Sequence, residues 1–177
     1  MHRLFVALRP PESVREMLFD AMEDGPAGVR WQDDEQLHLT LRFVGEIERP
    51  VAEDLANALA TIHAPLLSLA LAGVGQFDQG RRGVLWAGVE PRAPLKALHD
   101  KIDRACLAAG VASDRRAFHP HITLGRWSGG AIDPTTWLLR HAALSSEAFE
   151  ITSFGLYESI LTRSGAHYEQ RANYSLA

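Results

Sequence analysis

The stretch Phe118-His119-Pro120-His121-Ile122-Thr123-Leu124-Gly125-Arg126 contains a pattern that the chain has already used once. The earlier copy is Leu37-His38-Leu39-Thr40-Leu41-Arg42-Phe43, and both copies read His, apolar, Thr, apolar. The two copies lie close to half of the 177-residue chain apart. One such tetrapeptide is a weak signal. Two copies, each in an apolar run at this spacing, indicate two similar halves that share one function.

Each copy has the alternation of a β-strand, in which successive side chains point to opposite faces. His38 and Thr40 therefore share one face of the first expected strand, and His121 and Thr123 share one face of the second. The apolar residues between them turn to the other face, toward a core. Two such strands at a common cleft bring together two imidazoles and two hydroxyl groups.

These four side chains suit acid–base chemistry at a phosphodiester. An imidazole has an unperturbed pKa of about 6.5, so near neutral pH one histidine can accept a proton from water while the other donates one to a leaving oxygen. Each positioned proton-transfer group is worth roughly 10²–10⁴-fold in rate. Threonine hydroxyls can donate hydrogen bonds to non-bridging phosphate oxygens. The scheme requires no metal ion and no cofactor.

The paired His-x-Thr-x motifs resemble those of the 2H phosphoesterase superfamily, and in particular its bacterial and archaeal RNA 2′,3′-cyclic phosphodiesterase branch. The similarity runs from near residue 3 to near residue 175. It is carried, besides the second motif, by Arg3-Leu4-Phe5-Val6-Ala7-Leu8-Arg9-Pro10-Pro11, Gly75-Gln76-Phe77, Val84-Leu85-Trp86, Tyr157-Glu158-Ser159, Gly165 and Tyr168. The resemblance implies hydrolysis of 2′,3′-cyclic phosphate ends of RNA, or of small nucleotides, to 2′-phosphates. It also implies that His38 is the proton donor and His121 the proton acceptor.

Apolar periodicity and Gly and Pro breaks predict the order of elements. The first half is expected to hold strands at 3–9, 29–32, 37–44, 66–74 and 84–89, with helices beginning near 11 and 50. The second half is expected to hold helices beginning at 94 and 134, the second motif strand at 118–126, and strands at 149–160 and 168–176. The predicted class is α+β: one domain over 1–177 with two pseudo-symmetric lobes, each an antiparallel sheet backed by helices, around a central cleft.

Composition narrows the partners. The chain is 46% hydrophobic and 23% charged, which is typical of a globular protein, and its net charge is −4. Proteins that wrap long nucleic acids usually carry a basic excess, so we expect contact with only an RNA end or a few nucleotides. The one cysteine, Cys106, is expected in the core. No apolar run approaches the ~18 residues of a membrane span, so we expect a cytoplasmic protein that binds no membrane. We also expect a monomer.

Two arginines are candidate phosphate ligands. Strand parity puts Arg42 on the face of the first histidine and threonine, although a surface role at the strand end fits the pattern equally well. Arg126 follows Gly125 at the exit of the second motif strand, where its guanidinium can bind a phosphate with two hydrogen bonds. Phe43 falls on the opposite face and is expected in the core, unless twist at the strand end turns it toward a base.

Metal binding is the alternative chemistry for the second motif. His119 and His121 have a spacing that can ligate zinc, and His38 could supply a third nitrogen. Pro120 between them disturbs the strand parity, and threonine stands where a metal site favours Asp, Glu or Cys. We therefore expect no metal and a supporting role for His119. The other histidines are expected to be surface or packing residues: His2, His63, His99, His141 and His167.

Two further classes of function fit the same motifs. A related enzyme could cleave 2′–5′ linkages, act on another small cyclic phosphate, or join RNA by the reverse reaction, because the motif chemistry is shared. A nucleotide-binding module could keep the pocket without catalysis, although two intact histidines argue against it. Substrate assays distinguish these alternatives.

Overall fold

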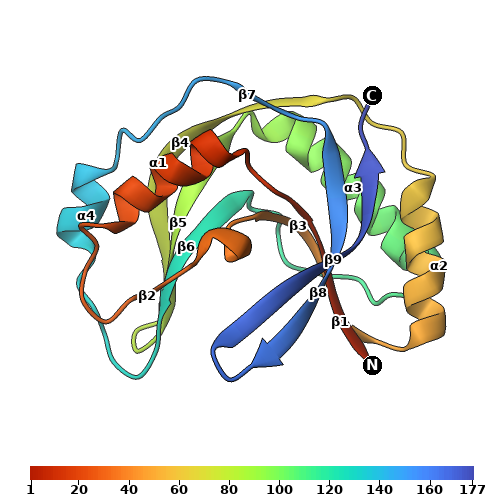
Figure 1. Ribbon diagram of the computed structural model, residues 1–177, viewed down its shortest axis with the longest axis horizontal. Coiled ribbons are helices and arrows are strands. Elements are labelled where there is room, and N and C mark those ends of the chain that lie inside the picture. Colours follow the sequence, from red (N-terminus) through yellow and green to blue (C-terminus); the bar gives the residue numbers. More distant parts are fainter.

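Nine strands form one curled antiparallel sheet in the computed structural model, which describes residues 1–177 (Figure 1). The strands are β1 (His2–Leu8), β2 (Arg30–Trp31), β3 (Leu39–Ile47), β4 (Leu67–Asp78), β5 (Gly83–Glu90), β6 (His121–Trp127), β7 (Phe149–Ile151), β8 (Ser153–Thr162) and β9 (Gly165–Ser175). The helices are α1 (Glu12–Met22), α2 (Arg49–Ala60), α3 (Arg92–Ala108) and α4 (Thr135–Arg140), with a 3₁₀ turn at Asp34–Gln36.

The sheet consists of two halves, in the order β7-β4-β5-β6 and then β3-β1-β8-β9, with β2 added beside β6. Helices α1 and α4 lie on the side of the first half, and α2 and α3 on the side of the second (Figure 1). The indole nitrogen of Trp137 in α4 donates to the carbonyl oxygen of Ala21 in α1 at 2.8 Å. The α+β class with two similar halves is confirmed. The halves differ from the expectation in sharing one continuous sheet.

The halves meet where β3 and β6 pair, and the paired residues are Leu39 and Ile122. Each is the residue directly after a motif histidine. The register of an antiparallel pair then sets His38 across from Thr123, and His121 across from Thr40. The strand junction is therefore what brings the two distant motifs together.

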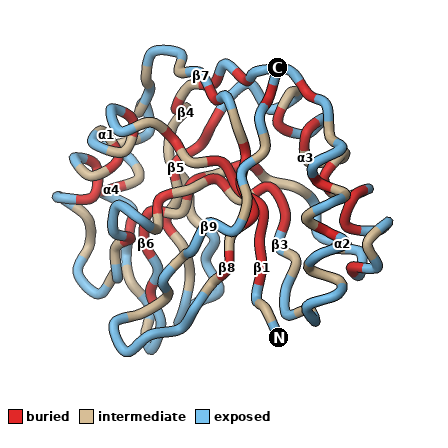
Figure 2. Tube along the Cα trace, turned by 45° about the vertical axis from the view of Figure 1, so that its right-hand side comes forward, coloured by how far each residue is buried: buried red, intermediate tan, exposed pale blue.

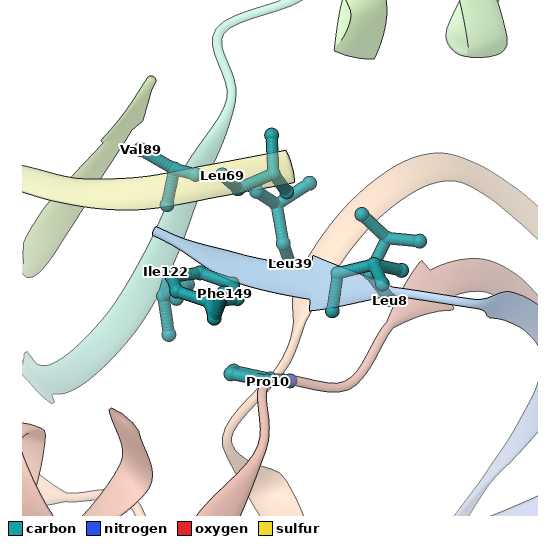
Figure 3. A pocket seen from close by; sticks show the side chains of 8 residues that line it. Leu8, Pro10, Leu39, Leu69, Val89, Ile122 and Phe149 are labelled. Atoms are coloured by element: carbon teal, nitrogen blue, oxygen red, sulfur yellow. The ribbon is translucent and has the colours of Figure 1, made fainter. Parts of the chain in front are cut away.

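Apolar side chains support this junction from behind. Leu39 and Ile122 are 2% and 1% exposed, and they face a cluster that includes Leu8, Val89 and Phe149 (Figure 3). The cluster leaves a gap of about 10 Å³, which is roughly the space of one water molecule. It is a packing gap rather than a ligand site. The strands along the middle of the sheet hold much of the buried chain (Figure 2).

Three of the differences from the sequence expectation change the path of the chain or the pairing of its strands. The acidic turn before the first motif is a 3₁₀ helix, in which Asp33 accepts from the backbone nitrogen of Gln36 at 3.0 Å. Strand β4 continues through the polar residues 76–78, where it pairs with β5. The single strand expected at 149–160 is split at Thr152. Its first part pairs with β4 and its second with β1 and β9, so the chain crosses between the halves at that residue.

No helix in the structure combines the length and the apolar composition needed to cross a lipid bilayer.

Candidate active site

Both motifs open into one cleft between the halves of the sheet. Its volume is about 790 Å³, within the roughly 300–1,000 Å³ of small-molecule sites. His38, Thr40, His121, Thr123 and Arg126 all line it. The structure thus brings together five of the six predicted site residues, and the imidazoles face a common space.

The backbone fixes the ring orientation of His38. Its Nδ1 lies 2.6 Å from the carbonyl oxygen of Gln36, which can only accept, so Nδ1 carries a proton. In the neutral ring Nε2 is then an acceptor, and the Thr40 hydroxyl donates to it at 2.9 Å. The rings of Phe5 and Tyr168 hold the imidazole, with centroids 4.9 and 5.2 Å away. The Nε2 atom faces the cleft as a group that can exchange a proton.

His121 has the same arrangement in the other half. Its Nδ1 donates to the carbonyl oxygen of His119 at 2.6 Å, so the neutral ring also presents Nε2 as an acceptor. Phe77 and Trp86 hold this imidazole, with centroids 5.0 and 6.0 Å away. No protein group bonds to its Nε2. This nitrogen is free to accept a proton from a bound water.

His119 supports this wall of the cleft. Its ring packs edge-on against Trp86, with centroids 4.9 Å apart, and against Phe77 at 5.4 Å. Its carbonyl oxygen orients His121. The structure shows no group of three or more His, Cys, Asp or Glu side chains arranged to hold a metal ion. The zinc alternative, with His38 as a third ligand, therefore has no geometric support.

Strand β3 contains a bulge directly after its motif. Thr40 pairs with Ala7 of β1, and Arg42 pairs with the neighbouring Val6. Leu41 is thus an extra residue without a partner in the register. Leu41 and Arg42 are consecutive residues and both are buried, which strict alternation would not allow.

Strand β6 contains the equivalent bulge. Thr123 pairs with Trp86 of β5, and Gly125 pairs with Leu85, so Leu124 is the extra residue. Each bulge shifts the alternation by one position. The residue that returns to the cleft face is therefore the fifth after the histidine: Phe43 in one half and Arg126 in the other.

Comparison with known proteins assigns a family to this geometry. The family model described as the 2′-5′ RNA ligase superfamily matches residues 10–161. The chain belongs to that superfamily. A protein of Aeropyrum pernix named RNA 2′,3′-cyclic phosphodiesterase is 36% identical over 156 residues, covering 86% of this chain and 89% of that one. A protein of the same name from Escherichia coli K12 is 30% identical and covers 98% and 96%.

Solved structures of superfamily members show the same fold. E. coli LigT in its apo form superposes with a TM-score of 0.80 at 30% identity, covering 99% of this chain and 98% of that one. The LigT structure with 3′-AMP gives a TM-score of 0.82 at 28% identity with the same coverage. The fold and the resemblance expected from the paired motifs are thus confirmed.

The structure corrects the expectation for Arg42. Arg42 is only 4% exposed, and it does not line the cleft. Its guanidinium donates to Asp103 of α3 at 2.8 Å and to the carbonyl oxygen of Ala112 at 2.7 Å, and also to the carbonyl oxygen of Phe43. The bulge at Leu41 is the cause, because it turns Arg42 away from the face of His38. Arg42 is therefore neither a phosphate ligand nor a surface residue.

Phe43 is a cleft residue that strand parity placed in the core. Phe43 is 49% exposed, although it is a large apolar residue on a strand. The guanidinium carbon of Arg116 lies 5.8 Å from its ring centroid. The sequence signal was present, since Phe43 and Arg126 are both the fifth residue after a motif histidine. Strict alternation hid that correspondence.

Burial and positive charge keep both imidazoles neutral. Burial lowers the pKa of His38 to about 4, and the charges of Arg126 and Arg9 act in the same direction, while the hydrogen bond to Gln36 opposes them. Burial also lowers the pKa of His121 below its usual value, with the charge of Arg126 contributing. Because an anion would stabilise the protonated rings and the arginines, the cleft favours the binding of a negatively charged ligand.

Proposed function

We propose that this protein is an RNA 2′,3′-cyclic phosphodiesterase that hydrolyses cyclic phosphate ends to 2′-phosphates by two-histidine acid–base catalysis. The observation that carries the proposal is the symmetry of the cleft. Two imidazoles, each fixed through Nδ1 by a backbone carbonyl, present Nε2 to the same space as two hydroxyls and Arg126. Relatives at 36% and 30% identity are named for this activity.

His121 acts as the base. Its Nε2 has no competing partner in the protein and can remove a proton from a water that attacks phosphorus. The new bond forms between the water oxygen and phosphorus, in line with the bond that breaks. The stable Nδ1–H bond to His119 holds the ring through the proton transfer.

His38 acts as the acid and donates its Nε2 proton to the departing 3′ oxygen. The free protein holds this ring neutral, so His38 has to acquire a proton when substrate binds. An anionic phosphodiester in the cleft provides the reason, because a negative charge within a few ångströms favours the imidazolium. Thr40 then releases Nε2, because a protonated Nε2 no longer accepts, and its hydroxyl can rotate to donate to the phosphate.

The phosphate is held by neutral and charged donors. Thr40 and Thr123 lie on the same face as the histidines and can donate to its non-bridging oxygens. Arg126 can bind the same oxygens with two parallel hydrogen bonds and offset the charge that develops during attack. Phe43 offers an exposed aromatic face to the base of the terminal nucleotide. Stacking on such a face is worth about 1–3 kcal/mol per base.

The direct test uses 2′,3′-cyclic AMP and a short RNA ending in a cyclic phosphate, with 2′- and 3′-phosphate products separated by chromatography. We expect the 2′-phosphate only, full activity after treatment with a chelator, and loss of turnover in His38→Ala and His121→Ala. His63→Ala is the matched control, because His63 is exposed and away from the cleft. Full activity in either cleft variant, with the protein folded, refutes the mechanism.

The family description favours one second candidate, joining of RNA through a 2′–5′ linkage. That reaction runs through the same four groups, with a 5′ hydroxyl in place of water. Incubating an RNA with a cyclic phosphate end and a second RNA with a 5′ hydroxyl separates the two functions. A joined product in excess of the hydrolysed end favours the ligase.

A further inference from the structure

The cleft has a second concentration of positive charge that the two-histidine mechanism does not use. Arg30 of β2 is the register partner of Arg126 of β6, so the two side chains stand directly opposite on one face. Like charges in this position destabilise a strand pair. Both residues line the cleft, and neither forms an ion pair or side-chain hydrogen bond in the protein.

Arg3 of β1 lines the same cleft from the opposite half of the sheet and also has no ion-pair partner. With Arg116, four arginines line a cleft in a protein of net charge −4. One carboxylate, Asp33, lines it too, and it accepts from the backbone of Gln36 at 3.0 Å. The excess of cations is therefore local to the cleft.

Tyr168 lies beside the first histidine, on the side of the cleft that Arg3 lines. Its ring centroid is 5.2 Å from that of His38 and 5.0 Å from that of Phe5, which is two residues after Arg3 on β1. Burial raises the pKa of the Tyr168 hydroxyl, and the charges of Arg126, Arg3 and Arg30 oppose that rise. The charges of Arg3, Arg30 and Arg126 thus all act on the Tyr168 hydroxyl, and all four residues line the one cleft.

We propose that Arg3, Arg30 and the Tyr168 hydroxyl form a second phosphate-binding position, which takes the phosphate on the 5′ side of the nucleotide that carries the cyclic end. This inference rests on the proposed phosphodiesterase function. The position supplies two guanidinium groups and a hydroxyl, all suited to an anionic oxygen. A bound phosphate relieves the opposition of Arg30 and Arg126, because it places negative charge between them.

The position makes the enzyme prefer longer substrates. A nucleoside 2′,3′-cyclic phosphate fills only the histidine site, whereas a dinucleotide with a cyclic end, such as ApA>p, fills both positions. A nucleotide with a 5′-monophosphate and a cyclic phosphate, pA>p, presents the same chemistry from a second source. Comparing A>p, pA>p and ApA>p therefore distinguishes a general 5′ phosphate site from one that needs an internucleotide linkage.

The test is the ratio of kcat/KM for ApA>p to that for A>p, measured in wild type and in variants. We expect the wild-type ratio to be about tenfold or more, and Arg30→Gln to reduce it by about tenfold, mainly through KM. Tyr168→Phe removes only the hydroxyl and keeps the ring that packs on His38, and it should reduce the ratio by a smaller factor. Arg92→Gln is the control, an exposed arginine outside the cleft.

Two outcomes overturn the proposal. A wild-type ratio near one means that no second phosphate is bound. If Arg30→Gln lowers kcat/KM equally for A>p and ApA>p, Arg30 binds the cyclic phosphate itself. Failure of the proposed function is separate, because it appears as no hydrolysis of A>p by wild type. In that case the ratio of the equilibrium affinities for ApA>p and A>p, measured in wild type and in Arg30→Gln, still decides the question.

Discussion

His99 donates a hydrogen bond from Nδ1 to the carbonyl oxygen of Leu41 across 2.6 Å. Leu41 is the extra residue of the β3 bulge, and His99 comes from helix α3. The same imidazole stacks on Phe118, with centroids 4.2 Å apart and planes 2° from parallel. Phe118 leads into the second motif strand. His99 therefore ties the bulge of one motif to the approach of the other.

Replacing His99 by alanine should release this bulge. We expect unfolding to become easier by about 1–3 kcal/mol, because the bonding partner of a part-buried carbonyl is lost. We also expect KM for a cyclic dinucleotide to rise more than kcat falls, since Phe43 follows the bulge, whereas backbone carbonyl oxygens still fix His38 and His121. Urea unfolding and steady-state kinetics measure the two effects. A wild-type KM in the folded variant would contradict this role for His99.

Arg42 and Arg126 should behave as opposites when each is changed to methionine. Arg42→Met leaves Asp103 without its buried partner and should cost about 3 kcal/mol of unfolding free energy, while retaining activity at low temperature. Arg126→Met should leave stability within about 0.5 kcal/mol, because the side chain is exposed and unpaired, and should reduce kcat sharply. The reverse pattern would mean that the bulges have been assigned to the wrong positions.

The paired motifs were readable from the sequence because they depend on local alternation. His38 with Thr40, and His121 with Thr123, share a face in any unbroken strand, and the structure places all four in one cleft. The two bulges could not be predicted from the sequence. An extra residue is defined only against the neighbouring strand, so Leu41 and Leu124 look like ordinary members of an alternating run until β1 and β5 are in place.

Contacts between distant segments could not be predicted from the sequence either. His99 lies 58 residues from the carbonyl that it binds, so nothing near it in the chain marks its role. The crossing at Thr152 was missed for a related reason. Residues on both sides of it have strand-forming side chains, and only the identity of the partner strand changes. Local propensity predicts that a segment is extended but not which strand it joins.

Gly125 should tolerate no side chain. A Cβ there would lie 2.5 Å from Val29 and 2.8 Å from the Trp31 ring, which packs against the strand at this point. Gly125→Ala should therefore displace β2 and cost about 1–3 kcal/mol. It should also weaken activity, since Arg126 is the next residue. Gly130→Ala is the matched control, because a Cβ there meets nothing within 4 Å. Thermal unfolding of the two variants gives the comparison, and equal melting temperatures would rule out this packing constraint.

The lowered pKa of His38 makes stability depend on pH in a defined direction. The folded protein protonates this ring at about pH 4, and the unfolded chain near its ordinary value of 6.5. Between these values the unfolded state binds more protons, so stability falls as pH falls through the window. The contribution is up to about 3 kcal/mol. His38→Gln should lose less stability than wild type between pH 7 and roughly pH 4.5, as measured by urea unfolding at each pH.

The affinity for an anion should depend on pH in the opposite direction and rise as pH falls. Sulfate keeps a constant charge across this pH range, and in the cleft it favours the imidazolium of His38. Its affinity should therefore increase as pH falls from 7 toward 5, because binding is coupled to proton uptake. Calorimetry in two buffers of different ionisation enthalpy measures that uptake directly. We expect most of the uptake to vanish in His38→Gln and to remain in His63→Ala. Sulfate that binds to wild type with no proton uptake would show that His38 does not become the acid on which the mechanism depends.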